Sequence, residues 1–284
     1  MGPILRVHPA RYLTFLQTIH SRWSRIPGAS AEVIPNIHPA NRTDGYPLSA
    51  VGQAGFHQTD TSCPISAETW GAAYASAQTA IHAADLVLTG QRAVYGLCRP
   101  PGHHAGADYL GGYCFINQAA VAAQAARDAG IARVAILDID YHHGNGTQDI
   151  FWDRGDVIYA SVHADPATDF PFYWGHADEV GEGAGAGATL NLPLPQGTTL
   201  TAFRAAQATA LDAIARFNPG LLIVSFGADT FEGDPIANFA LKTSDYAMLA
   251  RDIAATGLPT VVLTEGGYAV DNLGENLGSF LSGF

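Results

Sequence analysis

The sequence predicts an α/β protein with a mainly parallel β-sheet covered by helices on both faces. Short, continuous apolar runs alternate with longer segments of helical periodicity, which is the pattern of repeated strand–helix units. Because the apolar runs are continuous, the strands are expected to be buried on both faces. Of the 284 residues, 48% are hydrophobic and only 14% are charged, so the chain can bury a substantial core and is not expected to be disordered.

Five segments are predicted to be strands because each is short, β-rich and bounded by Gly, Pro or Asp. A further strand pattern, TLNLPLP, follows the glycine-rich segment GEGAGAG at 181–187. No helix follows those glycines to supply a dipole, so the segment is not expected to bind phosphate. The five predicted strands are residues 93–98, 133–139, 156–162, 221–227 and 260–266.

The segments between these strands include four predicted helices. One ends at Gly130, a natural C-terminal cap, and the last one begins with a Thr/Ser/Asp cluster that can cap its N-terminus. We see no internal repeat or linker, so residues 1–284 are expected to form a single domain. Residues 27–65 and 163–188 are expected to be long surface loops, which are often functional. The predicted helices are residues 66–90, 115–130, 198–217 and 243–257.

Charge and cysteine content narrow the class of function. The formal net charge of −12 disfavours nucleic acid as a partner and would attract a cationic ligand. Cys63, Cys98 and Cys114 lie far apart in the sequence and cannot all pair, which indicates a reducing compartment. No apolar run has transmembrane length and the N-terminus does not resemble a signal peptide, so we expect a cytoplasmic protein with no membrane partner.

Polar motifs follow all five predicted strands at the point where each strand ends. In open parallel sheets, ligands bind outside the carboxyl ends of the strands. Because five separate strand ends deliver ionisable or hydrogen-bonding side chains to the same edge, we expect one shared site there. The motifs are RPPGHH, DIDYHH, SVH, GAD and EGGY, in chain order.

The motif LDIDYHHGNG, residues 137–146, predicts a metal site. In an extended segment Asp138, Asp140 and His142 point the same way because they are two residues apart. Asp140 and His142 can then bind one cation, with Asp138 behind them and Asp229 as the third ligand. Two carboxylates and one imidazole suit one Zn²⁺ per chain and leave positions open for substrate, although Fe²⁺ or Co²⁺ suits the same ligands. The alternative is a set of turn and capping carboxylates without a metal.

The adjacent His103 and His104 follow a rigid Pro-Pro-Gly turn and are candidates for proton transfer beside the metal. An imidazole needs a partner on its far nitrogen to set its tautomer. Asp138 and Asn145 are the available partners. Asp138 would raise the basicity of its histidine, whereas the neutral Asn145 would only orient one.

Tyr268 in EGGYAV is a further catalytic candidate. The preceding glycines allow a sharp turn or a close backbone approach, and the phenol could donate a hydrogen bond to a developing oxyanion. The alternative is an ordinary turn tyrosine.

Several motifs in order along the chain resemble the zinc-dependent histone deacetylase family. Within that family the chain is most similar to the acetylpolyamine amidohydrolases, on the segments at 165–179 and 227–246. The resemblance implies an arginase/deacetylase-type three-layer α/β/α fold that hydrolyses an N-acetyl amide of a primary amine. The motifs are RPPGHHA, GGYCFIN, DIDYHHGNGTQDIF, SVH, GADTFEGDP and EGGY.

By position, the resemblance implies zinc bound to Asp140, His142 and Asp229. It implies that His103 and His104 are the tandem proton-transfer histidines, with His104 as general base and acid, and we expect the neutral Asn145 to be the partner of His104. A structural K⁺ site would use Asp138, Asp140, His142, Ser161 and Val162.

The resemblance also implies a substrate channel next to Tyr268, the residue that would polarise the scissile carbonyl. Aromatic walls suit a thin alkyl chain with a cationic end. The channel would have Asp60 at its rim, Gly112 and Tyr113 on one wall, and Phe172 or Tyr173 opposite.

The start of the chain departs from the family pattern, since some tens of residues that form a strand, a loop and a helix in the family are expected to be absent. Such a shortening would leave part of the sheet edge open, to be covered by residues 27–65 or by another subunit in a homo-oligomer.

Other functions remain open at this stage. The same fold could act on acetyl-lysine proteins or another small amide. A binuclear manganese ureohydrolase would need an Asp where Gly227 stands. A non-catalytic acyl-ligand binding protein is the third possibility.

Overall fold

The core of the molecule is a six-stranded sheet in which every pairing is parallel, with the strand order β1-β6-β5-β2-β3-β4. We describe residues 1–40 and 44–284 from a computed structural model. The five predicted strands and the TLNLPLP pattern are all confirmed, with ends shifted by a few residues. The strands are β1 (Ala93–Gly96), β2 (Val134–Asp138), β3 (Val157–Ala164), β4 (Thr189–Leu194), β5 (Leu221–Phe226) and β6 (Thr260–Thr264).

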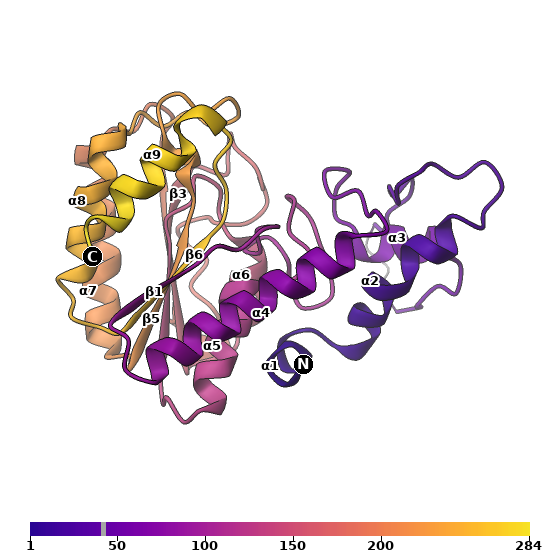
Figure 1. Cartoon of the computed structure of the whole chain (residues 1–284), viewed down its shortest axis with the longest axis horizontal. Helices are drawn as coiled ribbons and strands as arrows, with labels where there is room; N and C mark the ends of the chain where they lie inside the picture. The colour runs from indigo at the N-terminus through magenta and orange to yellow at the C-terminus, as the bar shows by residue number, and fades with distance from the viewer. Residues whose placement is uncertain (41–43) are drawn as a thin grey trace.

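Helices cover both faces of this sheet, as the continuous apolar strands predict, and produce the three layers seen in Figure 1. Alternate residues of each strand face opposite layers. Ile136 and Ile223 pack in the core beneath α4 and α5, whereas Leu137 and Val224 pack in the core beneath α7, α8 and α9. These helices are α4 (Thr69–Leu88), α5 (Gln118–Asp128), α7 (Leu200–Phe217), α8 (Thr243–Ala254) and α9 (Val270–Leu281).

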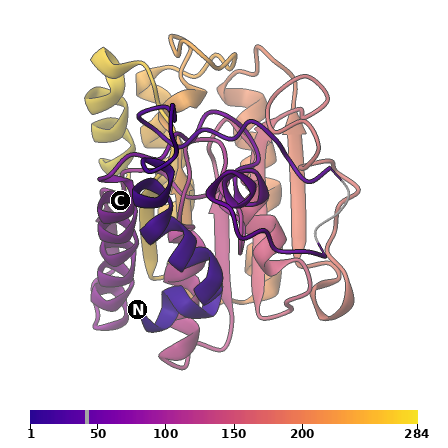
Figure 2. The same ribbon diagram turned by 90° about the vertical axis from the view of Figure 1, so that its right-hand side faces the viewer.

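The N-terminal part of the chain forms a helical extension to one side of the layered body (Figure 1), and Figure 2 views the molecule from the side of this extension. It contains α1 (Gly2–Val7), α2 (Ala10–Trp23) and α3 (Ala50–His57). The prediction of a surface loop over 27–65 is therefore wrong at α3, whose two glycines hide its helical pattern. Val33 and Ile65, also in that range, are buried and pair with each other.

The carboxyl ends of the parallel strands lie at one edge of the sheet, where the connection after β2 is short and the one from β3 to β4 is long. The short helix α6 (Asn145–Phe151) follows β2, and a 3₁₀ turn, Ala228–Thr230, follows β5. Asp138 at the end of β2 stands in register with Ser161 of β3 and Ser225 of β5. Among the described helices, none combines the length and the hydropathy needed to cross a bilayer.

Candidate active site

Three potential metal ligands from two strand ends converge at the carboxyl edge of the sheet. The Nδ1 atom of His142 lies 3.0 Å from Oδ2 of Asp229 and 3.4 Å from Oδ1 of Asp140. The two aspartates are fully buried, and the side chain of His142 is only 12% exposed. The chain therefore brings two carboxylate oxygens and one imidazole nitrogen around a single point, a donor set that suits a divalent transition metal.

The charges at this point are unbalanced without a cation. Burial and the nearby charge of Asp140 raise the pKa of Asp229 to about 7. Burial alone would lower the pKa of His142, but its contacts with Asp140 and Asp229 raise it to about 10. The carboxylates thus draw a positive charge onto His142, and a metal ion at the same point would replace it.

Backbone groups orient both carboxylates. Asp229 Oδ1 accepts a hydrogen bond from the backbone N–H of Tyr141 at 2.9 Å, and Asp140 Oδ2 accepts one from Gly266 N–H at 2.8 Å. The backbone approaches so closely that a Cβ at Gly266 would lie 2.4 Å from Asp229 Oδ2, and one at Gly227 would lie 2.0 Å from Asp140 Oδ2. A second carboxylate cannot fit at Gly227, which excludes the binuclear ureohydrolase site.

The tandem histidines have different partners. His103 Nδ1 lies 3.1 Å from Oδ2 of Asp138, whereas His104 Nδ1 lies 2.8 Å from Oδ1 of Asn145. Burial disfavours the charged form of His103, but the carboxylates of Asp140 and Asp138 outweigh it and hold the pKa of His103 well above its usual range. Burial, with the positive charge of His103, holds the pKa of His104 well below its usual range. These surroundings thus favour the charged form of His103 and the neutral form of His104.

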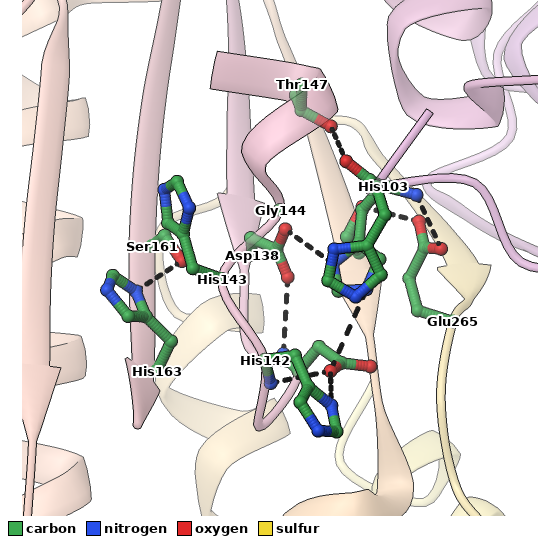
Figure 3. Close-up of polar contacts among 12 residues, drawn as sticks. His103, Asp138, His142, His143, Gly144, Thr147, Ser161, His163 and Glu265 are labelled. Carbon is green, nitrogen blue, oxygen red and sulfur yellow. Dashed lines mark hydrogen bonds and ion pairs between the residues drawn. The ribbon is translucent and has the colours of Figure 1, made fainter. Parts of the chain in front are cut away.

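Glu265, for which the sequence predicts no role, fixes the position of the tandem histidines. Its Oε2 accepts hydrogen bonds from the backbone N–H groups of Gly102, at 2.7 Å, and His103, at 3.1 Å (Figure 3). Its Oε1 accepts a hydrogen bond from the hydroxyl of Ser225 at 2.9 Å. Burial raises the pKa of Glu265 to about 7. The only sequence signal for this residue is its place directly before the glycines of EGGY.

Helix α6 supports the histidines from the opposite side. The backbone N–H of Thr147 donates to the carbonyl of His103 at 3.0 Å. A Cβ at Gly146 would lie 2.3 Å from the carbonyl carbon of Ala105, so only glycine allows α6 this close. The conformation of the GHH turn therefore depends on the HHGNG motif that follows β2.

Tyr268 is held at the same edge by its backbone. Its N–H donates to Oδ2 of the buried Asp234 at 2.7 Å, and Gly267 before it has a φ of 137°. Its ring lies 5.7 Å from that of Tyr113, and the two rings help to line a cavity of about 710 Å³. Burial and the charges of Asp229 and Asp140 hold the pKa of Tyr268 well above its usual range, so its hydroxyl keeps its proton to donate.

The aromatic residues at the site differ in how close they lie to the histidines. The ring of Phe170 lies 5.0 Å from that of His104 and 6.2 Å from that of His142. Phe172 lies behind Phe170, at 6.2 Å, and Tyr173 is 79% exposed. The inner aromatic contact is thus made by Phe170, which was not predicted, because nothing in DFPFYW distinguishes one of its four aromatic rings from the others.

The opposite wall depends on a turn held by Asp60. One carboxylate oxygen of Asp60 accepts from the backbone N–H of Gly112 at 2.8 Å, and the other accepts from Ser62 N–H and Oγ. Tyr113 has a φ of 68°, and a Cβ at Gly112 would lie 2.3 Å from Cδ2 of His104. The carboxylate of Asp60 therefore supports the turn at Gly112 that places Tyr113 on this wall.

Two of the residues predicted to bind potassium, Asp140 and His142, are themselves candidate metal ligands, and Asp138 lies next to them at the end of β2. Asp138 Oδ1 accepts from the backbone N–H of Asp140 at 3.3 Å, and its Oδ2 accepts from Tyr159 Oη at 3.0 Å. Ser161 and Val162 lie on the adjacent strand, and the hydroxyl of Ser161 is 2.8 Å from Nδ1 of His163 (Figure 3).

This constellation can be compared with known proteins. The family model described as "Histone deacetylase domain" matches residues 2–284. The chain belongs to the histone deacetylase family. It is 48% identical to acetylpolyamine amidohydrolase 1 of Pseudomonas aeruginosa and 49% identical to the acetylpolyamine amidohydrolase of Mycoplana ramosa, with 99% of this chain and 82% of each relative covered.

A solved structure of this family has the same fold. The acetylpolyamine aminohydrolase of Burkholderia pseudomallei matches with a TM-score of 0.95 and 45% identity, covering all of this chain and 82% of the other. The arginase/deacetylase-type fold expected from the resemblance is thereby confirmed.

Proposed function

We propose that this chain is a single-domain, metal-dependent amidohydrolase that removes the acetyl group from N-acetylated polyamines. The observation that carries the proposal is the convergence of Asp140, His142 and Asp229 on one point beside His104, in a chain closely similar to acetylpolyamine amidohydrolases. The reaction adds water to the amide carbonyl, breaks the C–N bond and releases acetate and a primary amine.

Zn²⁺ is the metal we propose for these three ligands, and Fe²⁺ or Co²⁺ would suit the same donors. When bound, the metal supplies a Lewis acid that polarises the amide carbonyl and promotes deprotonation of the attacking water. A K⁺ ion behind the site, at Asp138, Ser161 and neighbouring backbone oxygens, would offset the negative charge of the aspartates.

The hydrogen bonds of the histidines support different roles for them. His104 bonds to a neutral amide, so its ring can accept a proton from the attacking water and then give it to the leaving nitrogen. His103 bonds to the carboxylate of Asp138 and stays protonated, so it stabilises negative charge near the reacting carbonyl.

Tyr268 donates a hydrogen bond from its hydroxyl to the carbonyl oxygen as negative charge develops there. A contact of this kind strengthens along the reaction path, so it contributes to kcat more than to substrate binding.

The charge of the chain and the aromatic residues near the site favour a small cationic substrate. The net charge of −12 attracts a polyamine, and Phe170 and Tyr113 can flank a thin alkyl chain. The N-terminal extension is a candidate surface for self-association, which light scattering during gel filtration would test.

The decisive experiment measures kcat/KM of the zinc-loaded protein on acetylputrescine, acetylspermidine and an acetyl-lysine peptide. We expect the acetylpolyamines to be preferred by tenfold or more. Equal or better turnover of the peptide would assign the chain to protein deacetylation. Metal analysis of Asp229→Ala separately tests the ligand set, and a full metal equivalent in that variant would remove Asp229 from it.

A further inference from the structure

The orientation of the Asn145 side chain decides which nitrogen of His104 carries the proton. With its Oδ1 toward His104, as observed at 2.8 Å, Asn145 accepts from Nδ1–H and leaves Nε2 as the basic nitrogen. If the amide rotates by half a turn, its NH₂ group donates to Nδ1, and the proton of the neutral ring moves to Nε2. An asparagine alone does not distinguish these two states, so a further group must do so.

Tyr109 is placed to make that distinction. Its hydroxyl donates to Oδ2 of Asp149 at 2.6 Å and lies 3.3 Å from Nδ2 of Asn145. A phenol has one proton, and a carboxylate can only accept. Because that proton is directed to Asp149, the Tyr109 oxygen offers Asn145 only a lone pair. The amide must therefore turn its NH₂ group to Tyr109 and its Oδ1 to His104.

The surrounding backbone holds this chain of contacts in place. Asn145 and Asp149 are four residues apart on α6, so they lie on the same face of the helix. The Tyr109 ring packs against Gly106, where a Cβ would lie 2.2 Å from the Cε1 atom of the ring. Tyr109 thus approaches both residues of α6 from the loop that carries His104.

We propose that Tyr109, with its hydroxyl oriented by Asp149, is a positioning residue that sets the amide orientation of Asn145 and thereby the Nδ1–H tautomer of His104. This inference rests on the proposed function, in which His104 acts as the base. Tyr109 touches neither the metal ligands nor the reacting atoms, and it acts only through Asn145.

The direct test is ¹⁵N NMR of histidine-labelled, zinc-loaded protein, which distinguishes protonated from bare ring nitrogens without any turnover. We expect His104 to be the Nδ1–H tautomer in the wild type. One hydrogen bond contributes about 0.5–1.5 kcal/mol, so Tyr109→Phe should shift the tautomer ratio toward Nε2–H roughly 2- to 10-fold. Asp149→Ala keeps the Tyr109 ring and should shift it the same way, because the freed hydroxyl can donate to Asn145 Oδ1.

Tyr46→Phe is the matched control, because it removes a tyrosine hydroxyl that bonds to His57 and not to Asn145. It should leave the His104 signals unchanged. An unchanged tautomer ratio in both Tyr109→Phe and Asp149→Ala would overturn the inference, whatever reaction the protein catalyses.

Kinetics in the Asn145→Asp background distinguish an effect of Tyr109 on the amide orientation from a general loss of structure. Tyr109→Phe should lower kcat by several-fold with little change in KM. Both oxygens of an aspartate accept hydrogen bonds, so in the Asn145→Asp background the orientation no longer matters and the loss should disappear. An equal loss of kcat in both backgrounds would show that Tyr109 acts in another way. If acetylpolyamines are not hydrolysed at all, the proposed function fails while the NMR result still decides the role of Tyr109.

Discussion

Replacement of Gly227 by alanine should weaken metal binding through a single methyl group. Gly227 has φ −103° and ψ 131°, which alanine adopts without strain, so the effect is purely steric. The added Cβ would lie 2.0 Å from Asp140 Oδ2 and 2.7 Å from Asp140 Cα, against an ordinary carbon contact of roughly 3.5–4 Å. The end of β5 and the segment after β2 would therefore have to separate by about 1 Å.

The cost of this separation should appear in the stability, the metal content and the turnover of the variant. Overpacking of this kind destabilises by about 1–3 kcal/mol, and a displacement of about 1 Å at a catalytic group costs on the order of 10²-fold in rate. We expect Gly227→Ala to remain folded, with a lower Tm and less than one metal ion per chain. Its kcat should be lower by about 10²-fold or more.

The matched control is Gly274→Ala in helix α9, where a Cβ meets nothing within 4 Å. The same chemical change there should be neutral or stabilise by about 0.5–1 kcal/mol, because alanine favours the helix. A Gly227→Ala protein with a full metal equivalent and wild-type kcat would refute the close approach on which this argument depends.

Three further predictions concern single side chains. His104→Ala should lower kcat by about 10²–10⁴ while the metal stays bound, and near-normal turnover would contradict its role as the base. Tyr268→Phe should lower kcat on the order of 10²–10³-fold with KM nearly unchanged. An unchanged kcat would mean that Tyr268 is an ordinary turn residue. Burial lowers the pKa of His8 to about 4, and its ring lies between the carbonyl of Ala107 and the backbone N–H of Asn117. On acidification, His8 therefore takes up a proton in the unfolded state at a higher pH than in the folded state. The free energy of unfolding falls as the pH drops from about 6.5 to about 4. His8→Gln should reduce the loss in unfolding free energy between pH 7 and 4.5 by about 2 kcal/mol in denaturant titrations, and an unaltered pH dependence would argue against a neutral buried His8.

Several elements escaped prediction for a local reason. Helices α3 and α9 each contain two glycines, and α6 has only seven residues, so their sequences lack a sustained helical pattern. These helices form because tertiary packing outweighs weak propensity. The long helices α4 and α7 and the strands carry strong patterns, and these were found to within a few residues.

The sequence by itself determined the parallel α/β architecture and the edge at which chemistry occurs. Apolar patterning and strand polarity act locally, and together they require Asp140, His142 and Asp229 to emerge at the same edge. The tandem histidines and Tyr268 could be selected in the same way, because each follows directly from a strand end.

Only the tertiary structure decided the finer arrangement. It set the distances that join His103 to Asp138 and His104 to its expected partner Asn145, placed Phe170 against the histidines, and left no room for a carboxylate at Gly227. These outcomes depend on distances of a few ångströms between side chains on different elements. Such distances are set by how the sheet, the loops and α6 pack together, and no local pattern in the sequence encodes them.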